Sequence, residues 1–218
     1  MANDVSIKKL ILVPSVITLA VTLLRLTGEL LHWSPTLFNS AAGGGGAIVG
    51  IAWLAPLFGI YFGLKLANEG QAPAATGPAI GYSALGFALM PALGFGAVKL
   101  GMPQQSFSTF AVFIVLSIIG AAVAYRGWPA LGRTLLAYGL AARVPVMIVM
   151  LFAILGNWGT HYDVPPPNFP EMSPIAKWLL IGVLPQLTIW IWFTIAAGAI
   201  CGAIAAAATG RARRPAAA

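Results

Sequence analysis

The chain has 218 residues, of which 59% are hydrophobic and 8% are charged, and its mean hydropathy is +0.89. A soluble domain carries about 25% charged residues, so this composition excludes a soluble globular protein and predicts an all-α integral membrane protein. The formal charge of +7 is explained by Lys and Arg gathered on one side of a membrane, in contact with the lipid bilayer and its anionic head groups. Nucleic acid is therefore not an expected partner.

Six segments are long and apolar enough to cross a hydrocarbon core of about 30 Å, which needs about 20 helical residues. They predict a single bundle of six transmembrane helices, residues 1–210, followed by a short basic cytoplasmic tail, residues 211–218. The last segment is longer than a span requires, so it either tilts or, as we expect, continues beyond the bilayer as an alanine-rich helix to a point near Gly210. The predicted spans lie near Ile7 to Leu31, Ala47 to Leu66, Ala79 to Leu100, Phe107 to Tyr125, Leu131 to Gly156 and Pro174 to Ala207.

The distribution of Lys and Arg predicts the orientation of these spans. Basic residues gather on the cytoplasmic side of membrane proteins, and the side with most of the Lys and Arg is cytoplasmic when the N-terminus and the C-terminus are both inside. We therefore expect a multi-pass protein of the cell inner (plasma) membrane. The cytoplasmic residues would be Lys8, Lys9, Lys65, Arg126, Arg133, Arg211, Arg213 and Arg214, against Lys99 and Lys177 outside.

Polar side chains form one stripe along the first predicted span. At 100° per residue they fit within an arc of roughly 100°, and leucines and valines fill the adjoining surface. A charge near the middle of a span costs about 2.5 to 3.5 kcal/mol, so Arg25 and Glu29 must face partners or water. The stripe therefore predicts a face directed toward the protein interior, and it consists of Ser15, Thr18, Thr22, Arg25, Glu29 and His32.

Glycines and prolines interrupt several of the later spans. Glycines at small-xxx-small spacing favour close helix packing, here at Gly50, Gly59, Gly63, Gly81, Gly86, Gly94 and Gly96. Prolines within spans remove a backbone hydrogen bond and favour kinks, here at Pro56, Pro91, Pro145 and Pro185. Pro91 together with the glycines that follow it favours an unwound outer end of the third span.

Two connections are long, and both lie on the outer side in the predicted topology. The first contains the run Gly43 to Gly46, which is either a flexible joint, the commoner case, or backbone that another group approaches closely. The second contains the run Pro165 to Pro167, which favours a stiff path that is either a lid over the outer mouth or a spacer. Ser173 before Pro174 predicts the N-cap of the last helix.

Three deeply placed charges are the candidate polar centre: Arg25, Glu29 and Arg143. Arg25 and Glu29 are one helical turn apart, so their pairing leaves Arg143 to find Glu29, a carbonyl group or an anionic ligand. One interpretation is a structural clamp between the first and fifth spans. The other is a polar cavity in which the surplus arginine attracts an anion or Glu29 carries protons, with Thr22 and Gln186 as further polar groups.

His32, His161 and Asp163 are expected near the outer mouth of such a cavity. Their spacing matches no metal-binding motif, so we predict no metal and no cofactor. Three tryptophans are predicted to lie deep within the spans, and each has two possible roles. They either line a pocket for an apolar ligand or pack against helices and lipid, which is the commoner role: Trp53, Trp190 and Trp192.

The sequence leans against an enzyme, because hydrolase, metalloprotease and nucleotide-binding motifs are missing. We therefore predict a protein that binds or conducts a small polar or anionic solute or an ion through an outward-opening cavity. The alternative is a non-catalytic accessory subunit of a larger membrane complex, or a homo-oligomer, in which the charges form the clamp. A third alternative, an enzyme acting on a lipid-like substrate at the outer interface, lacks a catalytic motif.

Overall fold

The computed structural model describes residues 6–103 and 106–210, and the predicted basic tail, 211–218, lies outside this part of the chain. All regular elements of the described residues are helical. Within these residues five helical segments are long and apolar enough to cross a membrane, which makes this a multi-pass membrane protein. They are α1 (Ile7–Leu30), α3 (Thr76–Lys99), α4 (Phe107–Gly127), α5 (Pro129–Gly156) and the composite segment Pro174–Ala208.

The predicted second span, Ala47 to Leu66, is wrong in its extent. Helix α2 (Leu54–Asn68) has 15 residues, so it is about 22 Å long and shorter than the hydrocarbon core. The preceding chain contains only a 3-10 turn, η1 (Ala42–Gly44), and Gly43, Gly44 and Gly46 have positive φ angles. The described residues therefore contain five candidate spans and a short α2, and the predicted bundle of six spans is not confirmed.

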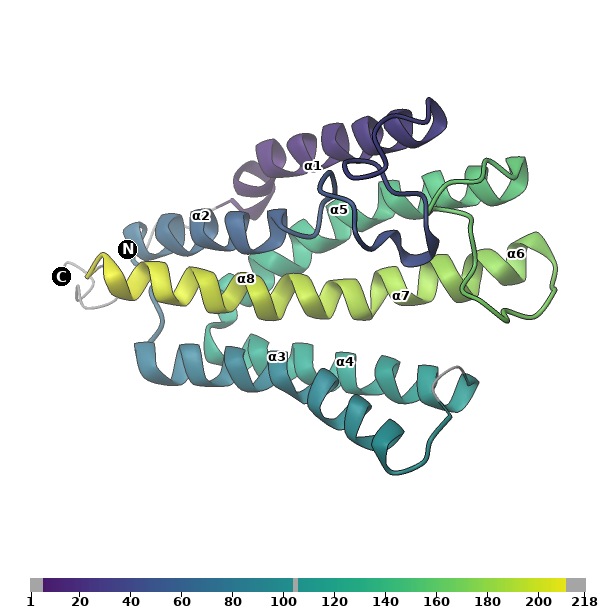
Figure 1. Ribbon diagram of the computed structural model, residues 1–218. Coiled ribbons are helices and arrows are strands. Elements are labelled where there is room, and N and C mark those ends of the chain that lie inside the picture. The colour runs from purple at the N-terminus through teal and green to yellow at the C-terminus, as the bar shows by residue number, and fades with distance from the viewer. Residues whose placement is uncertain (1–5, 104–105, 211–218) are drawn as a thin grey trace.

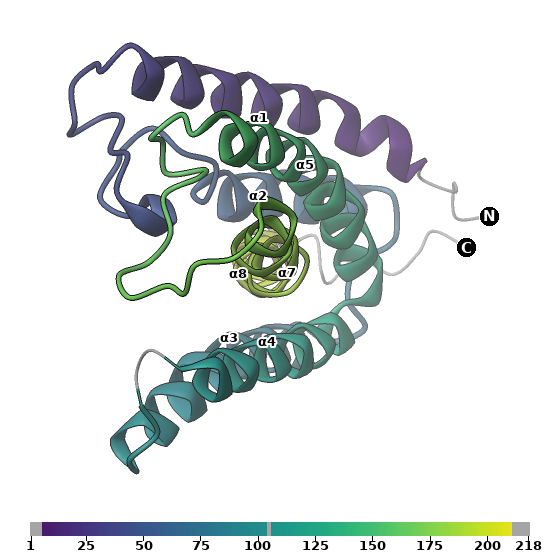
Figure 2. The ribbon, with the colours of Figure 1, turned by 90° about the vertical axis from the view of Figure 1, so that its right-hand side faces the viewer.

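The helices are arranged around α8 (Ile189–Ala208). Figure 2 shows α3 and α4 as a pair on one side of α8, with α1, α2 and α5 on the other side. Successive helices alternate in direction (Figure 1). The starts of α1 and α5 and the ends of α2 and α4 therefore lie at the same end of the molecule, and the two long loops lie at the opposite end.

Glycine contacts hold the central helices together, as the small-xxx-small spacing predicts. A Cβ atom at Gly63 of α2 would lie 2.7 Å from the Cα of Gly202 in α8. A Cβ atom at Gly120 of α4 would lie 2.5 Å from the carbonyl oxygen of Gly86 in α3. These distances require glycine, because a real Cβ atom would force the helices apart. The prediction does not hold at Gly81 and Gly96, where no atom lies within 4 Å of such a Cβ, nor at Gly50, which lies before the start of α2.

The predicted unwinding of the third span is wrong. Helix α3 runs without a break from Thr76 to Lys99, with Pro91 inside it. A Cβ atom at Gly94 would lie 2.5 Å from the ring of Phe113 in α4. Packing against α4 therefore holds this part of the helix in place, and the backbone group that Pro91 leaves unpaired is tolerated in the membrane setting.

The last span is the one that departs from regular α-helix. It consists of α6 (Pro174–Lys177), the π-helical segment η2 (Trp178–Val183), α7 (Leu184–Leu187) and α8. The Ser173 hydroxyl accepts a hydrogen bond of 3.4 Å from the amide of Ala176, which confirms the predicted N-cap. Pro185, in α7 directly after the π-helical segment, has no amide hydrogen to donate to the helix. Segments of π-helix occur often at functional sites. The irregular segment lies beside α5, where the Trp178 indole donates to the carbonyl of Met147 over 2.8 Å.

Candidate functional site

The polar stripe of α1 faces the protein interior, as predicted. Thr18, Thr22, Arg25 and Glu29 are buried, whereas Leu12 and Val16 beside the stripe are 61% and 59% exposed. The Thr18 hydroxyl lies 2.7 Å from the hydroxyl of Tyr138, which joins α1 to α5. The two ends of the stripe differ, because Ser15 is half-buried and His32 is exposed.

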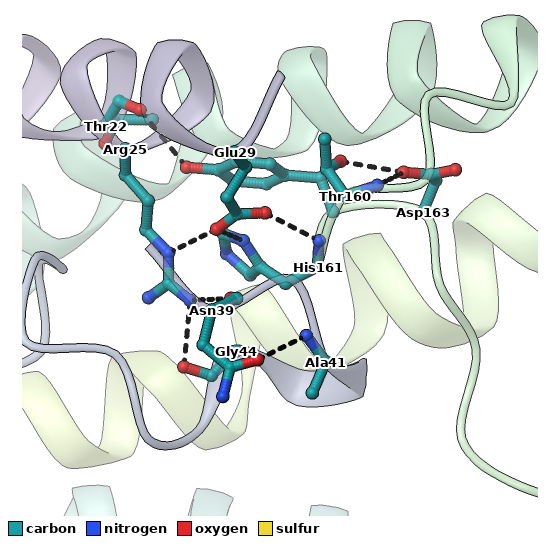
Figure 3. A network of polar contacts seen from close by, with 10 residues as sticks. Thr22, Arg25, Glu29, Asn39, Ala41, Gly44, Thr160, His161 and Asp163 are labelled. Carbon is teal, nitrogen blue, oxygen red and sulfur yellow. Dashed lines mark hydrogen bonds and ion pairs between the residues drawn. The ribbon is translucent and has the colours of Figure 1, made fainter. Parts of the chain in front are cut away.

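Glu29 is the centre of a cluster that we call the Glu29 cluster, formed by Arg25, Glu29 and His161 (Figure 3). The Glu29 Oε1 atom accepts from Arg25 Nε over 2.7 Å and from His161 Nδ1 over 2.5 Å. The Oε2 atom accepts from the backbone amide of His161 over 2.8 Å. Because a carboxylate only accepts, His161 carries its proton on Nδ1. The cluster fastens the second long loop to α1.

Arg25 also fastens the first long loop. Its NH2 group donates to the carbonyl oxygens of Asn39, at 3.0 Å, and Gly44, at 2.9 Å. Gly44 has a φ of +69°, and a Cβ atom there would lie 2.6 Å from the His161 ring and 3.0 Å from the Arg25 guanidinium. Of the two interpretations of the glycine run, close approach by another group is the one that applies at Gly44.

A cavity of about 900 Å³ lies beside the Glu29 cluster, and both long loops contribute to its walls. The other walls come from α1, α4, α5, the irregular start of the last span and the first residues of α8. Pro166 and Pro167 of the second loop are among the lining residues, so this loop covers the site rather than only joining two helices. The predicted site residues that line the cavity are Thr22, Arg25, Arg143, His161 and Gln186.

Two predicted residues of the outer mouth do not line this cavity. Asp163 is buried and accepts three hydrogen bonds from its own turn: from the amide of Gly159 over 2.9 Å, and from the amide and hydroxyl of Thr160 over 2.7 Å each. Asp163 therefore stabilises the loop that carries His161. His32 has a φ of 52° and follows the end of α1 on the surface.

Arg143 is separate from the Glu29 cluster, so the three-residue clamp does not form. Arg143 is 4% exposed, and its NH1 group donates to Gln186 Oε1 over 3.3 Å. Its Cζ atom lies 4.5 Å from the centre of the Trp190 ring, which provides a cation–π contact. Within the described residues no carboxylate pairs with Arg143, and its buried Nε has no hydrogen-bond partner.

The charges around the cavity therefore do not cancel. Glu29 balances Arg25, and burial lowers the pKa of His161 below its ordinary value of 6.5, although the hydrogen bond to Glu29 acts in the opposite direction. His161 is then neutral at pH 7. The guanidinium of Arg143 remains as a cation on the cavity wall without a balancing carboxylate among the described residues.

Sequence reasoning did not identify two contacts of the site. The hydroxyl of Tyr162 donates to the carbonyl of Thr22 over 3.2 Å, which adds a further tie between α1 and the second loop. Trp190 was predicted either to line a pocket or to pack, but its place over Arg143 was not predicted. The spacing of four residues from Gln186 to Trp190 was a usable signal, because such residues share a helix face.

The deep tryptophans divide between the two predicted roles. Trp53 and Trp190 line the cavity, whereas Trp192 is buried, stacks on Phe87 and donates to the carbonyl of Gly86 over 2.7 Å. Trp192 is therefore a packing residue between α8 and α3.

In the described part of the chain, no three or more His, Cys, Asp or Glu side chains are grouped so that they could hold a metal ion. Comparison of the chain with protein-family models, with characterised proteins and with solved structures gives no match. The function is therefore inferred from the cavity and its charges.

Proposed function

We propose that this multi-pass membrane protein binds a small solute with an oxyanion group in the cavity, with Arg143 as the residue that recognises the negative charge. The observation that carries the proposal is the buried Arg143 Nε without a hydrogen-bond partner, on the wall of a cavity of about 900 Å³. A phosphate, sulfonate or carboxylate oxygen would satisfy this donor and balance the guanidinium charge. Guanidinium groups suit such oxyanions because they donate along two parallel directions.

The cost of burying this arginine supports a role in binding. An uncompensated charge in the interior is expensive, and buried polar atoms in native proteins are nearly always hydrogen-bonded. The bond to Gln186 and the Trp190 ring offset only part of that cost. Gln186 also donates to the sulfur of Met150 over 3.8 Å, so its amide holds Arg143 Nη1 in a fixed direction and leaves Nε without a protein partner.

The alternative function, an accessory subunit with the charges as a clamp, is supported only by the Glu29 cluster. That cluster joins α1 to both loops and does not include Arg143. A clamp explains why Arg25 and Glu29 are buried, but it gives no reason to bury a further cation. Purification from native membranes with a stoichiometric second protein would favour the accessory subunit.

We further propose that the cavity opens to the outer side of the inner membrane. Basic residues lie at the starts of α1 and α5 and at the ends of α2 and α4, which is the end opposite the two long loops (Figure 1). The positive-inside rule places that basic end in the cytoplasm. The loops that form the cavity walls then face outward, with both chain termini inside.

Thiol modification tests the anion site without knowledge of the natural solute. Val146 lies on the cavity wall three residues after Arg143. We expect a V146C variant, with the native Cys201 replaced by Ser, to react faster with a sulfonate-bearing methanethiosulfonate than with its quaternary-ammonium counterpart. A cavity of one charge sign raises encounter rates with opposite charge by about tenfold or more, and replacing Arg143 by Gln should remove the preference.

The matched control is a V144C variant, because Val144 is on the same helix but is 44% exposed and does not line the cavity. It should show no dependence on Arg143. Equal rates for the two reagents at position 146, or a preference that survives the R143Q change, would overturn the proposed anion site.

A further inference from the structure

The cavity walls have two chemically different parts. Arg143 and Gln186 give one polar part on the side of α5 and α7, and Arg25 and His161 add polar atoms near the loops. The wall contributed by α4 carries aromatic rings, Phe107, Phe110 and Phe113, and Leu180 and Ile181 of η2 add aliphatic surface. A small inorganic anion would leave this apolar wall without contact.

Large apolar residues that line the cavity are also exposed on the molecular surface. Ile48 is 63% exposed, Trp53 is 51% exposed and Phe107 is 60% exposed, and all three line the cavity. Exposed apolar side chains of this kind are suited to contact with hydrocarbon. The cavity is therefore accessible along an apolar route.

The position of the α3–α4 pair explains how that route arises. The pair packs on α8 through Gly86, Gly120 and Trp192. At the end of the molecule that carries the two long loops, α3 and α4 lie away from the last span (Figures 1 and 2). The aromatic wall of α4 then faces the irregular segment across the cavity instead of packing directly against it.

The geometry points to a membrane amphiphile as the solute: a molecule with an oxyanion head at Arg143 and an alkyl tail along Phe107, Phe110 and Ile181. This inference rests on the proposed anion site and adds the tail and its route from the bilayer. Each methylene buried contributes about 0.8 kcal/mol, so a tail would supply affinity that the head alone lacks. The contact between the oxyanion head and Arg143 would select molecules that carry a negative charge.

Protection of the V146C thiol from the sulfonate reagent tests this inference. The protein is held in a nonionic amphipathic polymer without added lipid, and the competitors are dodecyl phosphate, inorganic phosphate, dodecanol and dodecyltrimethylammonium. We expect dodecyl phosphate to protect at a concentration lower than inorganic phosphate by about tenfold or more. Dodecanol and dodecyltrimethylammonium should not protect, because neither carries an oxyanion.

A second variant separates the tail from the head. Replacing Phe110 by Ser should weaken protection by dodecyl phosphate and leave the preference for the sulfonate reagent unchanged. Equal protection by inorganic phosphate and dodecyl phosphate, with that preference intact, would overturn the amphiphile while the anion site stands. Protection by dodecanol equal to that by dodecyl phosphate would also overturn it. If V146C showed no preference for the sulfonate reagent, the proposed anion site itself would be wrong.

Discussion

Glu29 accepts hydrogen bonds from two segments that are far apart in the sequence, so its charge is central to the stability of the loop end. An E29Q change leaves the Arg25 guanidinium buried without a carboxylate. Breaking a buried pair in this way lowers the free energy of unfolding by about 3 to 5 kcal/mol. Thermal unfolding of the purified protein should show this loss, and the exposed Glu171 gives a matched control, E171Q, with little effect. An E29Q protein as stable as wild type would show that the Glu29 cluster is not structural.

We expect the stability of the protein to depend on pH through His161. Burial lowers the pKa of its imidazole below the ordinary value of 6.5, so the folded state binds fewer protons than the unfolded state as the pH falls below that value. Stability is therefore full above about pH 6.5 and is lost progressively below it, until the folded pKa is passed. Melting temperatures between pH 8 and pH 5, taken at about one-unit steps, should fall on the acid side.

The chain provides its own control for this pH effect, because its second histidine, His32, is exposed. An H161N variant should have a flatter acid limb than wild type, whereas an H32N variant should keep the wild-type slope. If H32N alone flattened the curve, the assignment to His161 would be wrong.

For single residues, the sequence predicts burial more successfully than it predicts which side chains form hydrogen bonds with one another. The spacing of Thr18, Thr22, Arg25 and Glu29 was sufficient to place them on one interior face, because helical periodicity is local. The partner of Arg143 was not predictable, because Gln186 lies 43 residues away in the chain and approaches through tertiary packing. Asp163 was expected at the mouth but caps its own turn.

Among the elements, α2 and α8 depend on contact between their glycines. A G63L change would push the side chain into the backbone of Gly202, where even a Cβ atom would lie 2.7 Å from the Cα. We expect a loss of about 1 to 3 kcal/mol or more, seen as a lower melting temperature and aggregation in detergent. G81L is the matched control, since no atom lies within 4 Å of a Cβ there. Similar losses in both variants would contradict a specific α2–α8 contact.

The elements that differ from the prediction do so for different physical reasons. The hydropathy of residues 47–66 suggested a span, but Gly50 and the preceding glycines favour turns over helix, so α2 begins at Leu54. Pro91 suggested a broken α3, yet packing against α4 keeps it regular. The π-helical segment at Trp178–Val183 carries no local signal beyond Pro185. The composition of the chain determines how much of it is helical, whereas packing against other helices determines whether a helix is interrupted at a given residue.

For the whole molecule, the predicted orientation has a direct test. Single cysteines in a C201S background can be placed at Ser40, in the first long loop, and at Glu69, after α2; both positions are exposed. A membrane-impermeant maleimide added to intact cells should label S40C and leave E69C unlabelled until the membrane is opened, because the two positions lie at opposite ends of the bundle. Labelling of E69C alone in intact cells would reverse the proposed topology.

The bundle has two groups of buried charges. The Glu29 cluster holds both long loops to α1, and Arg143 lies on the cavity wall without a carboxylate partner among the described residues. We propose that the Glu29 cluster contributes to stability and that Arg143 contributes to binding at a cost in stability. Replacing a buried charge that lacks a carboxylate partner by an apolar side chain of similar size removes its desolvation cost. The two groups of charges should therefore respond to mutation in opposite ways.

The thermal stability of an R143M variant measures this difference most directly. We expect its melting temperature to equal or exceed that of wild type, while E29Q unfolds at a lower temperature in the same buffer. A melting temperature of R143M that is lowered as much as that of E29Q would show that Arg143 stabilises the fold. That result would contradict the proposal that Arg143 binds an anionic solute.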